Sequence, residues 1–84
     1  MRTAAASNFR ALEVVVTDDR ITATLTDGRV ISVPLSWSWR LERATPAERA
    51  NYRLIGDGIG FHWPDVDEDI SVEGMLAGTP APRG

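Results

Sequence analysis

Apolar and polar residues alternate with a period of two over residues 21–26, as expected for a strand with one buried face. Asp27-Gly28 follows, and the apolar pattern then resumes until Pro34 ends it. An Asp-Gly pair between two such runs is typical of a type I′ hairpin turn, in which both central residues have positive φ. We therefore expect residues 20–26 and 29–34 to pair as antiparallel strands.

Two further segments carry strand patterns. Residues 12–16 form a β-branched apolar run that ends at a pair of aspartates, which indicates a strand before the hairpin. Residues 53–55 and 59–63 flank Gly56-Asp57-Gly58 and indicate a second, smaller hairpin. The strands therefore form a small curled antiparallel sheet, made of a meander plus a short second hairpin.

The middle of the chain changes to helical signals. Thr45-Pro46-Ala47-Glu48 combines an N-cap, a proline at the first helical position and a glutamate that completes a capping box. It predicts a helix over residues 46–52. A preceding short helix starts at Ser36 or Ser38.

A last helical turn is expected near the end of the chain. Ser71 is positioned to cap it, and Val72, Met75 and Leu76 supply its apolar side. Gly78 is predicted to end this helix, and Pro80 follows it.

Together these elements define an α+β fold class with two or three short helices. A chain of 84 residues is long enough for one domain. We place that domain at residues 10–78, after a flexible N-terminus at residues 1–9 and before an extended C-terminal tail at residues 79–84.

Composition excludes several kinds of chemistry. The chain has no cysteine, which excludes disulfides and thiolate ligands, and no lysine, which excludes Schiff-base catalysis. It has no apolar core of a signal peptide and no run of about 20 apolar residues that could span a membrane. We expect a cytoplasmic protein.

The net charge of −3 is unevenly distributed. Residues 37–56 carry four arginines and two glutamates, whereas residues 57–78 carry six acidic residues and no arginine. Such regions complement each other within one molecule or between two copies. The acidic total and the interleaved glutamates argue against direct nucleic-acid binding.

The acidic run from Asp65 to Asp69 raises the question of a metal site. An EF-hand loop that began at Asp65 would need glycine where Ile70 stands and glutamate where Leu76 stands. We therefore expect no metal and no cofactor. A looser site that combines His62 with these acids is the alternative, and with it a small metal-dependent or catalytic protein.

We expect the acids of this run to have two different roles. Asp69, which is near Ser71, is predicted to accept hydrogen bonds from backbone N–H groups at the start of the last helix. Asp65, Asp67 and Glu68 are predicted to lie exposed beside Trp63, available to an arginine-rich partner.

Aromatic and arginine residues complete the set of candidates. Trp63 is expected in the core, whereas Trp37 or Trp39 is the candidate for an exposed anchor, because Trp, Tyr and Arg concentrate in binding hot spots. The candidate partner-binding residues are Trp63, Asp65, Asp67, Glu68, Arg40, Arg43 and Trp39.

With these residues in view, the chain resembles a family of small bacterial proteins called domain of unknown function 2442. The resemblance covers about residues 10–78 and is most specific at His-Trp-Pro-Asp and Asp-Glu-Asp-Ile-Ser, within residues 59–72. The other similar runs are Asp27-Gly28-Arg29, Val33-Pro34-Leu35 and Ala44-Thr45-Pro46-Ala47-Glu48-Arg49.

The resemblance implies a small α+β fold with a curled antiparallel sheet. It also implies that the gene lies beside a second small gene, in a pair similar to a toxin–antitoxin module. Some family members carry a helix-turn-helix after this domain, which makes an accessory of a DNA-binding regulator another alternative. The resemblance supplies no catalytic residues.

We therefore interpret the chain as a non-enzymatic protein-interaction module, the neutralising or regulatory member of such a gene pair. Its expected partner is a small toxin-like protein encoded nearby. We also expect a homodimer, because the domain is small, the meander leaves a sheet edge open and the charged regions are opposed.

Overall fold

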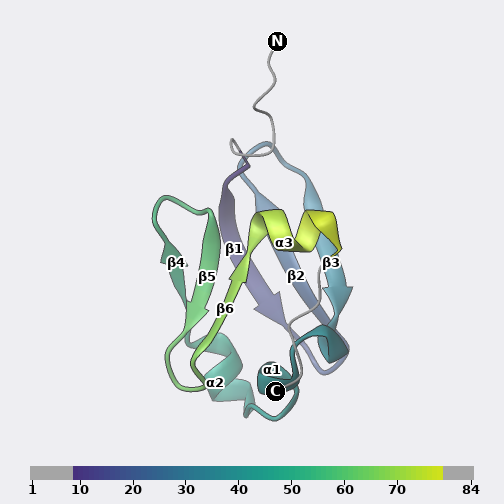
Figure 1. The fold of residues 1–84 in the computed structure, drawn as a ribbon, viewed down its shortest axis with the longest axis vertical. Coiled ribbons are helices and arrows are strands. Elements are labelled where there is room, and N and C mark those ends of the chain that lie inside the picture. Colours follow the sequence, from purple (N-terminus) through teal and green to yellow (C-terminus); the bar gives the residue numbers. More distant parts are fainter. Residues whose placement is uncertain (1–8, 79–84) are drawn as a thin grey trace.

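The structure is a computed structural model that describes residues 9–78. Within these residues six strands form two separate three-stranded antiparallel sheets, and short helices connect and cover them (Figure 1). The first sheet has the order β1 (Ala11–Val16), β2 (Arg20–Leu25), β3 (Val30–Pro34). The second has the order β4 (Arg53–Ile55), β5 (Gly60–Trp63), β6 (Glu68–Ser71). The helices are η2 (Leu35–Trp37, a 3₁₀ turn), α1 (Trp39–Glu42), α2 (Pro46–Ala50) and α3 (Val72–Ala77).

These elements confirm the predicted α+β class and most of the predicted order of strands and helices along the chain. The predicted tail at residues 79–84 lies outside the described residues, as does the predicted flexible N-terminus apart from Phe9. None of the helices in residues 9–78 has the length and apolar character needed to span a membrane.

The predicted pairing of β2 with β3 is confirmed, with Ile21 opposite Val33 and Thr24 opposite Val30. The turn itself differs from the predicted type I′. Leu25 N–H donates to the Arg29 carbonyl, which leaves a three-residue loop, and φ is positive at Gly28 but not at Asp27. A glycine that ends a three-residue loop in this way is the next most common hairpin solution.

The side chain of Asp27 explains why the longer loop is stable. One carboxylate oxygen accepts a hydrogen bond from Arg29 N–H and the other accepts one from Arg29 Nε. These bonds from Arg29 hold the pKa of the Asp27 carboxyl below its usual value. The aspartate therefore closes the loop through its side chain rather than through a left-handed backbone.

The second sheet contains a strand that the sequence analysis did not predict. Glu68 was not placed in any strand and was predicted to lie exposed, but β6 begins at Glu68, directly opposite Trp63 of β5. Glu68 faces the interior and Asp69 faces solvent, as the alternation of a strand requires. The strand was missed because a run of charged residues does not show the usual apolar alternation.

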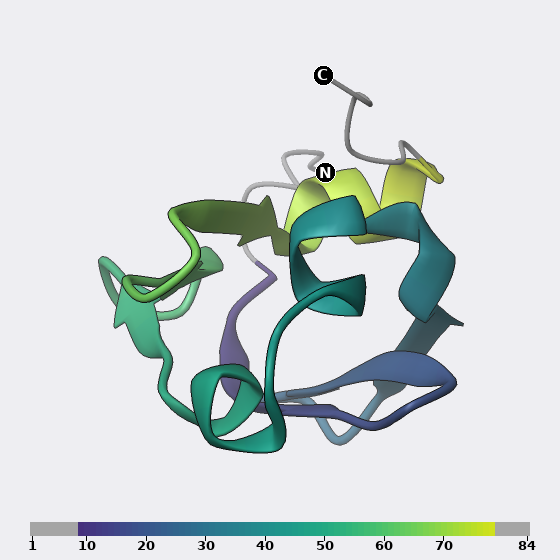
Figure 2. The same cartoon turned by 90° about the horizontal axis from the view of Figure 1, so that it is seen from below.

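Both sheets and α3 surround the interior of the molecule (Figure 2), and buried side chains from all three form one core. Phe61 and Trp63 are fully buried at its centre, and the ring of Tyr52 packs on both, 5.9 Å and 6.2 Å away between centroids. The Tyr52 hydroxyl accepts a hydrogen bond from Val14 N–H of β1 at 3.2 Å. Tyr52 therefore joins the two sheets through both its ring and its hydroxyl.

Two helices begin as predicted. Thr45 and Glu48 form the complete capping box of α2, although this helix ends at Ala50 rather than at residue 52. Ser71 caps α3 by accepting a hydrogen bond from Gly74 N–H, and Gly78 ends the helix with φ of 76°.

Candidate functional site

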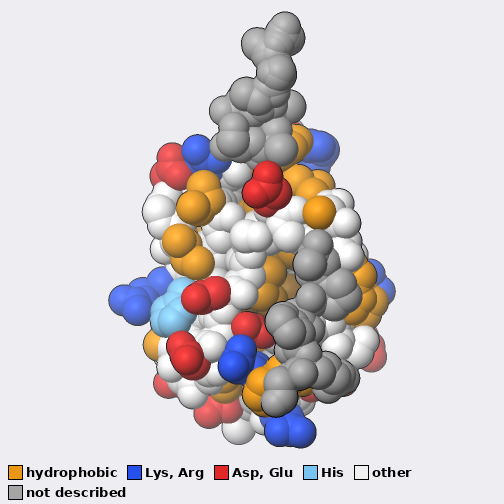
Figure 3. All heavy atoms as spheres, viewed as in Figure 1, with side chains coloured by type: hydrophobic (Ala, Val, Ile, Leu, Met, Phe, Trp, Pro, Cys, Tyr) orange, Lys and Arg blue, Asp and Glu red, His pale blue; other side chains and the backbone are white. Residues whose placement is uncertain are grey.

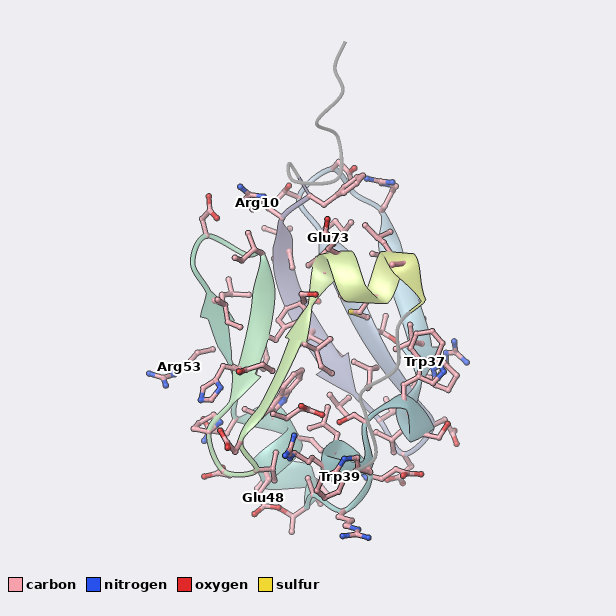
Figure 4. All side chains as sticks on the ribbon, in the orientation of Figure 1. Arg10, Trp37, Trp39, Glu48, Arg53 and Glu73 are labelled. Carbon is pink, nitrogen blue, oxygen red and sulfur yellow. The ribbon has the colours of Figure 1, made fainter. Side chains whose placement is uncertain are left out.

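The candidate site is built on α1 and on the turn between β5 and β6, at the end of the molecule opposite Arg10 (Figure 4). α1 presents one half-buried tryptophan, Trp39, and one arginine, Arg40, and its C-cap residue is Arg43. The guanidinium carbons of Arg40 and Arg43 lie over the Trp39 ring, 4.7 Å and 5.3 Å from its centroid. This geometry favours cation–π attraction and holds all three side chains together at the surface.

A buried polar contact fixes α1 against β6. Ser38 is fully buried, accepts a hydrogen bond from Leu41 N–H as the N-cap of α1, and donates one to Glu68 Oε2 at 2.5 Å. Glu68 Oε1 accepts from Asp69 N–H at 3.0 Å and lies 3.6 Å from Arg40 Nη1. Both oxygens of the Glu68 carboxylate therefore have hydrogen-bond partners. Arg40 is held between this carboxylate and the Trp39 ring.

The opposite end of α1 is held by Arg49, which is almost completely buried. Its guanidinium donates hydrogen bonds to the carbonyls of Leu41 and Glu42 and to Asp18 Oδ1. A cation beside the carbonyl groups of the last helical turn is favourable at a helix C-terminus. The backbone carbonyl of Arg49 in turn accepts a hydrogen bond from Trp63 Nε1 at 2.9 Å. Hydrogen bonds of Arg49 therefore connect the end of α1 to β5 in the core.

The turn between β5 and β6 carries the exposed acids. Asn51 Nδ2 donates to Asp65 Oδ2 at 3.0 Å, which links the turn to the end of α2. Asp67 adopts a left-handed conformation with φ of 53°, which aspartate tolerates better than most residues. Asp65 and Asp67 are both exposed, as predicted.

The structure exchanges the predicted roles of Glu68 and Asp69. Glu68 was expected to be exposed but is only 3% accessible, because its position on β6 faces the core. Asp69 was expected to cap the last helix, but it faces outward, and its carboxylate contacts His62 Nδ1. The hydroxyl of Ser71 provides the cap instead.

His62 lies on the outer face of the second sheet. Its cross-strand neighbours are Asp69 on one side and Arg53 on the other. Figure 3 shows the histidine at the surface next to acidic and basic side chains. Arg53, His62 and Asp69 therefore form a row of three charged or ionisable groups across the second sheet.

Of the predicted partner-binding residues, the structure brings most to one end of the molecule. Trp39 and Arg40 are half-buried there, and Arg43, Asp65 and Asp67 are exposed. Trp63 and Glu68 lie beneath this surface and support it from the core. In residues 9–78, no three or more His, Asp or Glu side chains are grouped so that they could hold a metal ion.

Neither of the two residues that support this surface, Ser38 and Arg49, was predicted from the sequence to do so. Ser38 was considered only as a helix start, and Arg49 only as one of several charged side chains. Their contacts cross 30 and 31 positions of the chain to Glu68 and Asp18, so no local pattern reveals them. The signal that could have indicated Ser38 is its place as the N-cap directly before Trp39 and Arg40.

Comparison with known families decides the relationship of the chain. The family described as "Protein of unknown function (DUF2442)" matches residues 11–81. The chain belongs to this family. The match confirms the resemblance found in the sequence, and its range contains the acidic run from Asp65 to Asp69.

Two solved structures are similar to this DUF2442 domain. A crystal structure of a protein of unknown function from Rhodospirillum rubrum has a TM-score of 0.76 and 26% sequence identity, and the match covers 90% of this chain and 94% of that one. A solution NMR structure of an uncharacterised protein from Chromobacterium violaceum has a TM-score of 0.73 and 20% identity, and covers 87% and 69%. The comparison with curated proteins gave no match. The two structures confirm the fold.

Proposed function

We propose that this DUF2442 domain is a non-catalytic protein-interaction module. Its binding site would be the surface formed by Trp39, Arg40, Arg43, Asp65 and Asp67, which we call the α1–turn surface. The observation that carries the proposal is the half-buried Trp39 ring beneath the guanidinium groups of Arg40 and Arg43. Tryptophan and arginine are the residue types that most often dominate binding energy at protein interfaces.

The rigid support of this surface favours binding over catalysis. Glu68 and Arg49 fix both ends of α1 through buried hydrogen bonds, so little conformational freedom is lost when a partner binds. His62, the residue most suited to acid–base catalysis, is flanked by Arg53 and Asp69, neither of which carries a hydroxyl or thiol nucleophile.

The exposed acids indicate the chemistry of the partner. Asp65 and Asp67 lie at a turn within a region of six acidic residues and no arginine. They suit a partner surface rich in arginine, and such a charge pair acts mainly on the association rate. In line with the family resemblance, we propose a small toxin-like protein encoded beside this gene, which the domain neutralises or regulates.

Affinity capture from the native host tests this function. The wild-type domain should capture a defined partner, identified by mass spectrometry, whereas Arg43→Ala and Trp39→Ala should each capture much less of it. Arg10→Ala is the matched control, because Arg10 lies at the opposite end, where it forms an ion pair with Asp57, and this variant should capture the partner normally. Equal capture by all four forms, each shown to be folded, would contradict the proposed surface.

We also propose that the α1–turn surface joins two copies of the domain when no partner is present. It carries arginines and aspartates on the same end of the molecule, so a two-fold contact can pair Arg43 of each copy with an aspartate of the other. Sedimentation should show a homodimer at low salt that dissociates as salt screens these charges. A monomer at high protein concentration and low salt would refute the dimer.

A further inference from the structure

The hydrogen-bond pattern of the first sheet defines which backbone groups lie at its outer edge. Leu25 N–H donates to the Arg29 carbonyl, so the backbone N–H and C=O groups of the odd-numbered residues of β3 point toward β2. Because backbone groups alternate along a strand, those of Val30, Ser32 and Pro34 point away from β2. β3 is the outermost strand of this sheet (Figure 1), so these three residues form its open edge.

The other sheet edges offer less to an added strand. The far edge of β1 is joined to the second sheet, because Ala11 N–H donates to the Gly58 carbonyl and Val14 N–H to the Tyr52 hydroxyl. β4 has three residues, of which only Leu54 directs its backbone outward. On β6, the outward N–H of Asp69 donates to Glu68 Oε1. The β3 edge is therefore the longest one that remains.

Arg20 crosses this edge from the neighbouring strand. Its Nε donates to Ser32 Oγ at 2.6 Å, and its Nη2 donates to the Ser32 carbonyl at 2.9 Å. The Ser32 carbonyl is the central outward acceptor of β3, so the guanidinium occupies the position where an added strand would bind. Pro34 has no N–H and removes the last donor of the edge.

We propose that the β3 edge is a latent site of strand pairing with a second copy of this chain, and that Arg20 keeps it closed. An antiparallel pair of β3 strands centred on Ser32 would join Ser32 N–H of each copy to the Ser32 carbonyl of the other. It would also join Val30 N–H of each copy to the Pro34 carbonyl of the other, which makes four hydrogen bonds in all. Two of these four bonds require the carbonyl that Arg20 occupies. Exposed edges of this kind cause aggregation when they are unprotected, and Val30, at 61% exposure, adds apolar area.

This inference is independent of the α1–turn surface and is tested with Arg20→Ala. At a salt concentration at which the wild type is monomeric, the variant should form a species with twice the wild-type mass in sedimentation velocity at equal protein concentration. Amide hydrogen exchange at Val30 and Ser32 should become slower as protein concentration rises, in the variant only. Arg29→Ala is the control, because Arg29 lies on the same hairpin but bonds to Asp27 in the turn.

A second variant separates edge pairing from loss of the fold. Arg20→Ala combined with Val30→Lys places a charge on the exposed edge and should return the protein to the wild-type mass. The proposal is overturned if Arg20→Ala keeps the wild-type mass and its Val30 and Ser32 amides exchange independently of concentration. It is also overturned if the added Val30→Lys change leaves the larger species intact.

Discussion

Glu68→Ala is expected to lower the free energy of unfolding by about 2–4 kcal/mol, because it breaks a buried hydrogen-bonded contact. The change leaves the buried Ser38 hydroxyl without its acceptor and removes the ion-pair partner of Arg40. Arg40 is partly exposed and can turn to water, which keeps the loss below that of a fully buried ion pair. Urea denaturation measures the effect.

Two further variants separate the possible causes at Glu68. Glu68→Gln keeps the shape and one acceptor oxygen, so it should cost less than the alanine change. Asp69→Ala, the next residue, removes only an exposed contact with His62 and should cost less than about 1 kcal/mol. If Asp69→Ala destabilises the protein more than Glu68→Ala does, the assignment of the two roles is wrong.

Gly58→Ala is expected to lower stability by about 3 kcal/mol or more, since backbone strain and steric overlap act together. Gly58 has φ of 109°, and an added Cβ would lie 2.5 Å from the carbonyl oxygen and 2.9 Å from the nitrogen of Ala11. Relief of that overlap requires β1 to move away from Gly58. This movement breaks the 2.7 Å hydrogen bond from Ala11 N–H to the Gly58 carbonyl.

Gly28→Ala is the matched control for this prediction. Gly28 also has positive φ, at 93°, but an added Cβ would meet no heavy atom within 4 Å. Its cost should therefore reflect backbone strain alone, about 1–2 kcal/mol. Thermal unfolding compares the two variants. Equal losses at Gly28 and Gly58 would show that the contact of Gly58 with β1 is not important for stability.

Local signals in the sequence predicted much of this fold. The Thr45–Glu48 capping box and the Ser71 and Gly78 ends of α3 depend on residues within one helical turn of each other. The Asp27-Gly28 hairpin likewise brings together residues that are close in sequence, which is why the pairing of β2 with β3 could be predicted. The turn type was wrong because the Asp27 side chain, rather than its backbone, closes the loop.

Features that depend on distant contacts could not be predicted. Whether Glu68 or Asp69 points inward depends on the register between β5 and β6, and a shift of one residue exchanges the two. The way the two sheets are joined depends on the contacts of Tyr52 and Gly58 with β1, and these contacts appear in no local pattern. The clustering of Trp39 with Arg40 and Arg43 required the start of α1 at Ser38, one of two starts that the sequence allowed.

The association rate of the captured partner tests the central claim, which is that the α1–turn surface binds it. Asp65→Asn with Asp67→Asn removes both charges, while asparagine still tolerates the left-handed backbone at position 67. We predict that stability stays nearly unchanged and that the association rate falls and depends less on salt than in the wild type. An association rate and salt dependence equal to those of the wild type would contradict the claim.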